Sequence, residues 1–268
     1  MTLPGRLVLL GHPVSHSLSP RLQQAALRSA SIALEYEAVD VAPAAFDETV
    51  RVLIAVRAAG NVTIPHKESM YAVCHSRSPI AERVGAVNTF WVENGRVHGD
   101  NTDVGGFDSA IRAAFGAPKP DMRLAVLGAG GAAAAVLAAA ERWAGASAVI
   151  ASRSRERAAA LAGRFTRMAR VAATYDTAAR DADLVVNATP LGLKGEPGPV
   201  DPAILRPGTI VYDLVYRRGL TPWVIRARAR GLAAEDGLGM LVEQGALAFT
   251  RWFGIEPDRR AMWDAVSS

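Results

Sequence analysis

The sequence has little lysine. Only Lys67, Lys119 and Lys194 occur among its 30 basic residues, and all the others are arginine. Where a surface needs only positive charge, this chain uses arginine. Arginine stays protonated in proteins, whereas lysine can lose and regain a proton. A lysine at the end of the polar run Asn61-Val-Thr-Ile-Pro-His-Lys67 therefore suggests proton transfer.

Cysteine is also scarce, since Cys74 is the only one. A single cysteine excludes an intrachain disulfide and a cysteine zinc cluster, and no other metal-ligand spacing is present, so we predict no metal. The first ten residues lack the pattern of a signal peptide, which favours a cytoplasmic location. The longest apolar run, residues 124–140, is interrupted by glycines and is shorter than a membrane span. It predicts a buried strand followed by a packed helix, without a membrane contact.

The net charge is +4 and the sequence pI is about 9.6. The arginine cluster at residues 226–230 has no interleaved aromatic residues and matches no nucleic-acid-binding motif, so we expect no nucleic-acid partner. Hydrophobic residues make up 50% of the 268 residues and charged residues 21%, as in ordinary globular proteins. This length suits one large domain or two modest ones.

The first half of the chain predicts short elements of mixed type. A helix is expected from Pro20 with Ser19 as its cap, and Asn94-Gly95 predicts the turn of a hairpin. The other predicted elements are strands at 7–10, 36–41 and 62–64, hairpin strands at 87–92 and 96–98, and helices at 46–58 and 103–115.

In the second half, strands and helices alternate. This alternation predicts right-handed βαβ units and a parallel sheet with helices on both faces. The predicted strands are 124–127, 148–151, 184–187 and 209–213, and the predicted helices are 132–143 and 154–165. Two further helices, 238–253 and 258–266, are expected to close the chain.

The first of these strands leads into a glycine-rich turn that opens a helix, Gly128-Ala129-Gly130-Gly131-Ala132. Such a turn directs backbone N–H groups and the positive end of the helix toward an anion, typically a dinucleotide. The spacing differs from G-x-G-x-x-G, and the alternative is a tight turn that serves packing alone.

The end of the next strand indicates which dinucleotide binds. NAD sites usually carry an acidic residue there, for the ribose 2′-hydroxyl. This chain instead has Ser152, Arg153 and Ser154, followed by Arg157, and arginine can hold a 2′-phosphate by a bidentate contact. NADP is therefore favoured over NAD. Arg155 is interpreted as a surface residue of a helix.

Asp103 follows Gly99-Asp100-Asn101-Thr102 and opens a predicted helix. Its simplest role is a helix cap. Paired with Lys67 beside a nicotinamide, it would instead hold an ammonium near a substrate oxygen. A ketone that receives a hydride needs a proton on its oxygen, and a positioned general acid supplies it.

The chain resembles the shikimate dehydrogenase family over nearly its whole length. The motifs that carry the resemblance are, in order, Gly11-His-Pro-Val-Ser-His-Ser17-Leu-Ser19-Pro20, Asn61 to Lys67, Gly85-Ala-Val-Asn88-Thr89, Asp100 to Asp103, Gly128 to Ala132, Asn187-Ala-Thr189-Pro, Asp213-Leu-Val-Tyr216 and Gly237-Leu-Gly-Met240-Leu-Val-Glu-Gln244. The chain differs from the common family pattern at three places. Ser152 stands where the family often has asparagine, and Val104 stands where it often has glycine. Ala134 or Ala135 stands where an arginine is frequent.

The resemblance implies roles for individual residues. Lys67 and Asp103 would be the catalytic pair. The substrate, a cyclohexene acid with hydroxyl groups, would be bound by Ser17, Ser19, Thr63, Asn88, Tyr216 and Gln244, with Asp103 also in contact. NADP would be bound by Gly128, Ala129, Gly130, Gly131, Ala132, Ser152, Arg153, Ser154, Arg157, Thr189, Leu214 and Gly237.

Structural alternatives exist for several of these residues. Ser19 could serve only as a cap, Asn88 as a turn residue and Tyr216 as part of the core. His12, His16 and His66 have no carboxylate partner that the sequence reveals, and they are interpreted as loop or packing residues.

The expected architecture is an α/β protein of two domains. Residues 1–104 with 239–268 would form a substrate domain, and residues 105–238 a Rossmann-type NADP domain, with the active site in the cleft between them. The implied reaction is the reversible, NADP-dependent reduction of 3-dehydroshikimate to shikimate by a monomer or homodimer. The alternatives are a quinate/shikimate dehydrogenase that uses NAD or more substrates, and a non-catalytic regulatory relative.

Overall fold

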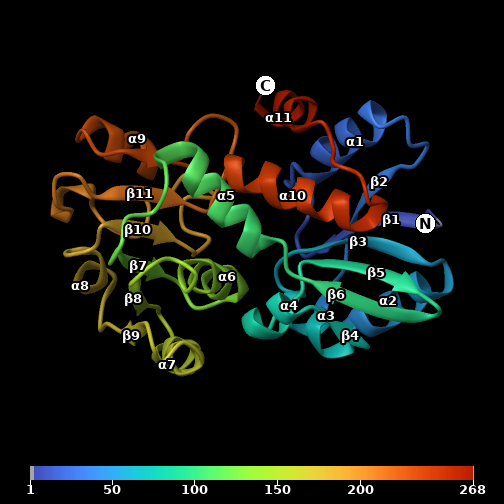
Figure 1. The fold of residues 1–268 in the computed structure, drawn as a ribbon, viewed down its shortest axis with the longest axis horizontal. Coiled ribbons are helices and arrows are strands. Elements are labelled where there is room, and N and C mark those ends of the chain that lie inside the picture. Colours follow the sequence, from blue (N-terminus) through green and yellow to red (C-terminus); the bar gives the residue numbers. More distant parts are fainter. Residues whose placement is uncertain (1–2, 268) are drawn as a thin grey trace. The chain divides into compact units, whose positions relative to one another are not determined.

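The computed structural model describes residues 3–267, which form two compact units (Figure 1). One unit combines residues 1–106 with 241–268, and the other is residues 107–240. Helix α5 (Asp103–Phe115) leads from the first unit into the second, and α10 (Leu238–Phe253) leads back. Within the described residues, no helix is both long and apolar enough to cross a membrane.

The first unit contains a mixed six-stranded sheet in the order β2-β1-β3-β5-β6-β4. Strand β1 is central to a parallel group, and β5 and β6 form an antiparallel hairpin beside β3. Asn94 and Gly95 both have positive φ, as a tight two-residue hairpin turn requires, so the predicted hairpin is confirmed. The strands are β1 (Arg6–Gly11), β2 (Tyr36–Asp40), β3 (Ala58–Val62), β4 (Ser76–Arg77), β5 (Thr89–Glu93) and β6 (Arg96–Asp100).

Helices cover this sheet and complete its core. Phe46 and Leu53 of α2 pack with Val8, Leu10 and Phe90 of the sheet. Helices α1 and α11 lie side by side in Figure 1 and contact each other. The helices of this unit, besides its parts of α5 and α10, are α1 (Ser19–Ser29), η1 (Pro43–Ala45), α2 (Phe46–Ala55), α3 (Lys67–Val73), α4 (Pro79–Val84) and α11 (Arg259–Ser267).

Three sequence predictions for this unit are wrong in detail. The strand predicted at 62–64 is β3 at Ala58–Val62, and helix α2 ends at Ala55 rather than at residue 58. The run Ala-Ala-Gly-Asn-Val has little intrinsic strand preference, and only its burial between β1 and β5 makes it a strand. Ser19 does not cap α1, because the helix already includes it.

The second unit is a six-stranded sheet in the order β12-β11-β10-β7-β8-β9, and all its pairings are parallel. This confirms the Rossmann-type sheet predicted from the alternating pattern. The strands are β7 (Arg123–Leu127), β8 (Ser147–Ala151), β9 (Ala169–Val171), β10 (Leu184–Asn187), β11 (Ile210–Asp213) and β12 (Ala234–Glu235). The helices are α6 (Gly131–Ala140), α7 (Arg155–Arg164), α8 (Tyr175–Ala179), η2 (Pro202–Ile204) and α9 (Pro222–Ala229).

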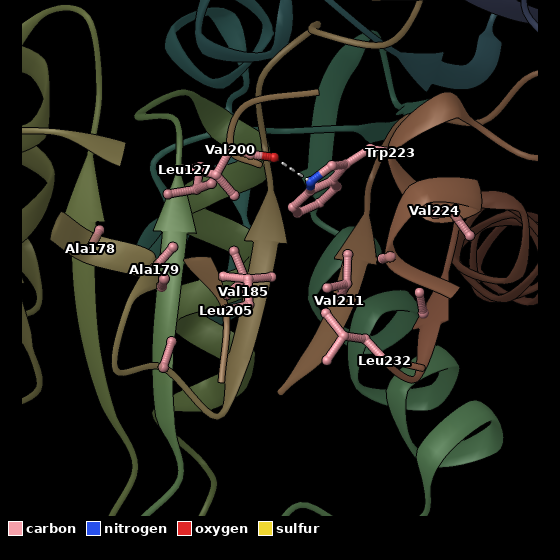
Figure 2. Close-up of a cluster of buried hydrophobic side chains, with 14 of the residues drawn as sticks. Leu127, Ala178, Ala179, Val185, Val200, Leu205, Val211, Trp223, Val224 and Leu232 are labelled. Atoms are coloured by element: carbon pink, nitrogen blue, oxygen red, sulfur yellow. Dashed lines mark hydrogen bonds between the residues drawn. The ribbon is translucent and has the colours of Figure 1, made fainter. Parts of the chain in front are cut away.

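Trp223 anchors one side of this sheet. Its side chain is fully buried in a cluster that includes Val185 and Val211 of the adjacent strands (Figure 2). The indole Nε1 donates a hydrogen bond of 2.9 Å to the carbonyl of Val200. Burying a tryptophan requires a partner for this donor. The bond thereby fixes the irregular segment before η2 against the sheet.

Candidate functional site

One edge of the first sheet collects most of the predicted substrate residues. The parallel strands β1 and β3 end at this edge, while the antiparallel β5 begins and β6 ends there. Residues that are distant in sequence therefore follow or precede neighbouring strand ends. Ser17 and Ser19 follow β1, Thr63 and Lys67 follow β3, Asn88 precedes β5, and Asp103 follows β6.

Lys67 and Asp103 form an ion pair at this edge. Lys67 is the first residue of α3 and Asp103 the first residue of α5, and Lys67 Nζ lies 2.6 Å from Asp103 Oδ2. The side chains are 17% and 6% exposed. The helix-cap alternative for Asp103 does not describe this carboxylate, which is held by side chains. An ammonium has three donor hydrogens, so Lys67 keeps others for a ligand.

Asn88 holds the second oxygen of the same carboxylate. Its Nδ2 donates to Asp103 Oδ1 at 2.7 Å, and its Oδ1 accepts a 2.7 Å bond from the backbone N–H of Thr102. The backbone donor fixes which end of the amide faces Asp103. Asn88 is thus more than a turn residue.

Gln244 reaches this group from α10. Its Oε1 lies 3.4 Å from Asn88 Nδ2, and its Nε2 donates to the carbonyl of Leu241 at 2.8 Å. The approach depends on Gly106 of α5, because a Cβ there would lie 2.6 Å from Gln244 Cβ and 2.8 Å from its backbone nitrogen. The lack of a side chain at Gly106 therefore lets α10 place Gln244 beside Asn88.

Thr63 lies beside the end of β1, which leads into the loop that carries Ser17 and Ser19. The Ser17 hydroxyl accepts a bond of 3.2 Å from the backbone N–H of Ser19. Thr63 bonds the carbonyl of Leu10 through its N–H, and a Cβ at Gly11 would lie 2.5 Å from Thr63 Cγ2. Ser17 and Thr63 are half-buried and Ser19 is buried.

His12 has a partner that the sequence did not reveal. Its Nδ1 lies 2.5 Å from Asp40 Oδ1, with both side chains about half exposed. The hydrogen bond from His12 holds the pKa of the Asp40 carboxyl below its usual value. His66 is buried, stacks on Phe46 and bonds the carbonyl of Val41, which agrees with a packing role.

A buried polar network around Asn88 was not identified as functional from the sequence. It consists of Tyr36, Asn61, Thr89 and Thr102, each at most 6% exposed. Asn61 is the one polar residue of β3, and Thr89 is followed by the apolar run Phe-Trp-Val of β5. Polar residues at such positions are the signal that could have found them, since buried polar groups need partners.

A second ion pair supports the segment that leads to Asp103. The Asp100 carboxylate is buried, contacts the Ser78 hydroxyl and lies 2.5 Å from Arg251 Nη2 of α10. Asp100 also accepts the backbone N–H of Asn101, and Asn101 Oδ1 accepts that of Asp103. These bonds fix the path of the backbone from the end of β6 to Asp103.

In the second unit, the glycine turn fits a dinucleotide phosphate. Gly128 has φ +126°, and a Cβ there would lie 2.5 Å from the carbonyl oxygen of Ala188. A Cβ at Gly130 would meet nothing within 4 Å, and α6 begins without a side-chain cap. The first N–H groups of α6 are thus open to an anion, and Ala129, Gly131 and Ala132 complete this turn.

Arg153 is the residue predicted to contact the 2′-phosphate. It follows β8, its side chain is exposed, and it forms no ion pair with any residue between 3 and 267. Ser154 caps α7, where its hydroxyl accepts the N–H of Arg157 and donates to Glu156. Ser152 is half-buried between β8 and this cap.

Asn187 and Asp213 organise the loops at the ends of β10 and β11. Asn187 Nδ2 donates to Asp213 Oδ1 and to the carbonyl of Leu191, both at 2.8 Å. Asn187 Oδ1 accepts both the N–H and the hydroxyl of Thr189. The Thr189 hydroxyl is therefore used within its own loop.

Asp213 is fully buried, and its other donors are Val215 N–H and the Thr221 hydroxyl. Burial raises the pKa of its carboxyl to about 6, against the lowering effect of these hydrogen bonds.

Leu214 and Gly237 lie together beside this pair. The Leu214 N–H donates to the carbonyl of Asn187, and a Cβ at Gly237 would lie 2.3 Å from the Leu214 carbonyl oxygen. Tyr216 lies in the same loop after β11 and is half-buried. The predicted substrate residues thus divide between the units, with Tyr216 alone in the second. Among residues 3–267, no cluster of His, Cys, Asp or Glu could hold a metal ion.

A parallel sheet with an open glycine turn, joined to a unit that carries a lysine–carboxylate pair, defines the class of two-domain nucleotide-dependent dehydrogenases. Family models match the chain as a shikimate dehydrogenase substrate binding domain at residues 9–90 and a shikimate 5′-dehydrogenase C-terminal domain at 237–266. A model of coenzyme F420-dependent NADP oxidoreductases matches residues 123–192.

Individual proteins agree with these matches. The shikimate dehydrogenase (NADP(+)) of Mesorhizobium japonicum is 43% identical over 92% of this chain and 90% of its own length. The shikimate 5-dehydrogenase of Thermus thermophilus, solved with NADP(H) and shikimate, is 40% identical with a TM-score of 0.87, covering 98% of each chain. Quinate dehydrogenase from Corynebacterium glutamicum, solved with NAD, is 28% identical with a TM-score of 0.86, covering 97% of each. The chain belongs to the shikimate dehydrogenase family.

The close approach of α5 and α10 gives a prediction for two adjacent glycines. At Gly106 an added Cβ meets the backbone of Gln244, whereas at Gly105 it meets only Leu247 Cδ1, the end of a flexible side chain. Alanine favours the helix equally at both positions. We expect Gly106→Ala to lower the free energy of unfolding by about 1–3 kcal/mol and Gly105→Ala to be neutral or stabilising. Urea unfolding of both variants tests this, and equal stabilities would contradict the packing described.

The raised pKa of Asp213 predicts a pH-dependent stability difference. Because the native carboxyl binds its proton more tightly than the unfolded one, its contribution is full below about pH 4 and is lost as pH rises through about 6. The free energy of unfolding of wild type relative to Asp213→Asn should therefore fall by about 2 kcal/mol from pH 4 to pH 7. Urea titrations at several pH values measure it, and parallel curves would contradict a raised pKa.

Proposed function

We propose that this protein is an NADP-dependent shikimate dehydrogenase that reversibly reduces 3-dehydroshikimate to shikimate. The observation that carries the proposal is the Lys67–Asp103 ion pair at the edge where Asn88, Gln244 and Thr63 also lie. The membership of the family supports it, since relatives above 40% identity are shikimate dehydrogenases that use NADP.

A substrate with several hydroxyls needs donors and acceptors directed at each of them. Ser17, Ser19 and Thr63 offer hydroxyls, and Asn88 and Gln244 offer amides, at or beside one sheet edge. The serine loop after β1 contains no arginine, so a substrate carboxylate there would be held by neutral donors. Tyr216 would complete the substrate contacts from the second unit.

The proposed chemistry needs one proton for each hydride. NADPH, when bound, supplies the hydride to the ketone carbon. Lys67 holds its ammonium proton toward the ketone oxygen and releases it as that oxygen gains negative charge. Asp103 keeps the ammonium in place, and solvent restores the proton to the neutral lysine. In the reverse direction, Lys67 accepts the proton of the shikimate hydroxyl.

For NADP, the glycine turn from Gly128 to Ala132 would hold the diphosphate, and Arg153 with Ser152 and Ser154 would hold the 2′-phosphate. Arg157 would add charge on the same side, and Thr189, Leu214 and Gly237 would line the nicotinamide end. An NAD-dependent enzyme that prefers quinate is the main rival. Its solved example is 28% identical, against 40% for the enzyme crystallised with NADP(H) and shikimate. A regulatory relative without activity would not need the lysine–carboxylate pair.

A single assay tests the function. Absorbance at 340 nm follows NADPH formation from NADP and shikimate, with quinate and NAD as the alternative substrate and cofactor. Turnover with NADP and shikimate should exceed every other combination. Faster turnover with NAD would refute the assignment of NADP as the cofactor. No turnover with any combination would refute the proposed enzymatic activity. Monomeric or homodimeric assembly and a cytoplasmic location stay predictions of the sequence.

Lys67→Ala tests the proton transfer. The variant lacks the ammonium but leaves the hydroxyl and amide groups in place, so kcat should fall about 10²- to 10⁴-fold while KM for shikimate changes only a few-fold. Lys119→Ala, at an exposed lysine outside the described site, is the matched control and should keep full activity. Retained turnover in Lys67→Ala would show that another group moves the proton.

Arg153→Ala tests the 2′-phosphate contact. Loss of the guanidinium should raise KM for NADP at least tenfold and leave KM for NAD unchanged, since only NADP carries that phosphate. Arg155→Ala is the control, because Arg155 is also exposed and lies two residues further along, at the start of α7. Equal effects of the two substitutions would indicate a general loss of positive charge instead.

A further inference from the structure

Three hydrogen bonds between buried side chains link Tyr36 to Asn88. The Tyr36 hydroxyl lies 2.8 Å from Asn61 Oδ1, Asn61 Nδ2 lies 3.0 Å from Thr89 Oγ1, and Thr89 Oγ1 lies 3.0 Å from Asn88 Oδ1. All four residues are at most 5% exposed. Asn88 then bonds Asp103, so the chain of hydrogen bonds starts in β2, crosses β3 and β5, and ends at the carboxylate.

Backbone groups fix the direction of this chain. Asn61 Nδ2 also donates to the backbone carbonyl of Asn88 at 3.1 Å, so the amide nitrogen must face that carbonyl. Asn61 Oδ1 is consequently left for Tyr36, and the phenol must be the donor. Asn88 Oδ1 accepts the backbone N–H of Thr102, so its nitrogen must face Asp103. Neither amide can be reversed without opposing a backbone group.

The geometry points to Tyr36 as a positioning residue for the proton transfer, acting through Asn61, Thr89 and Asn88 on the Asp103 carboxylate. This inference rests on the proposed function for its kinetic meaning. Every bond from Tyr36 to Asp103 has the same polarity, each group donating to the next. Hydrogen bonds of one direction polarise and strengthen one another, and the last of them favours the ionised carboxylate that holds Lys67.

Loss of the Tyr36 hydroxyl would not remain local. Asn61 Oδ1 would be left buried without this donor, and a buried polar atom without a partner is costly. Because Asn61 cannot turn without leaving the Asn88 carbonyl, the relaxation must pass to Thr89 and Asn88. The ring of Tyr36 lies 6.1 Å from that of Trp252, and this packing would survive in a phenylalanine. The hydroxyl can therefore be tested apart from the ring.

Tyr36→Phe is the direct experiment. We expect kcat for shikimate oxidation to fall about five- to tenfold, with KM for shikimate and NADP within twofold of wild type. Tyr71→Phe is the matched control. Tyr71 belongs to the same unit, but its ring packs against the Arg77 guanidinium and takes no part in this series of hydrogen bonds. An unchanged kcat in Tyr36→Phe would overturn the inference.

A double-mutant cycle tests the route. Thr89→Val removes the middle hydroxyl and should reproduce the loss of kcat, whereas Thr89→Ser keeps the hydroxyl and should restore activity. If Tyr36 acts through Thr89, adding Tyr36→Phe to Thr89→Val should cause no further loss. Multiplicative losses in the double variant would mean that Tyr36 does not act by this path.

A spectroscopic readout separates this inference from the function. In ¹⁵N–¹H spectra of the ligand-free protein, the side-chain amide signals of Asn88 should shift in Tyr36→Phe and not in Tyr71→Phe. Unmoved Asn88 signals would overturn the coupling even in an active enzyme. If wild type did not oxidise shikimate, the proposed function would fail, while the Asn88 signals would still decide whether Tyr36 positions this group.

Discussion

A buried carboxylate needs a counter-charge and hydrogen bonds from its neighbours. Asp103 of the first unit is such a carboxylate. A charge on a side chain that is only 6% exposed is costly unless a counter-charge and hydrogen bonds surround it. Lys67 supplies the counter-charge and Asn88 supplies the hydrogen bond. The chain places these groups by starting α3 at Lys67, β5 just after Asn88 and α5 at Asp103. The order of strands at this edge is therefore what makes the pair possible.

The groups around the pair restrict it from several sides. Asn101 holds the backbone of Asp103, and Asp100 with Arg251 holds Asn101. The Lys67 carbonyl accepts the N–H of Val87, next to Asn88, which ties the turn before β5 to the start of α3. A catalytic pair has to be held within a fraction of an ångström of its productive geometry. A site built at strand and helix ends, with these bonds behind it, satisfies that need better than a free loop.

The sequence indicated the residues proposed for the chemistry of this site more fully than the residues that hold them in place. Lys67 was conspicuous because lysine is rare here, and Asp103 because it opens a helix after a polar run. The parallel sheet followed from the alternation of predicted strands and helices, and the Asn94-Gly95 hairpin from turn chemistry. The strand Ala58–Val62 was misplaced because its small residues become a strand only through pairing on both sides. The partnership of Tyr36 with Asn61 was out of reach for a similar reason: it depends on register between strands, which local pattern does not encode.

Asp103 and Asp213 are both buried carboxylates at or after strand ends, and their surroundings differ in kind. Asp213 is held by an amide, a hydroxyl and a backbone N–H, and burial raises its pKa. Asp103 is held by an amide and by a lysine ammonium. Neutral donors can fix a loop but have no acidic proton to give at neutral pH, whereas an ammonium has one. The difference in partners therefore separates a residue that shapes the loops of the second unit from one suited to the proposed proton transfer.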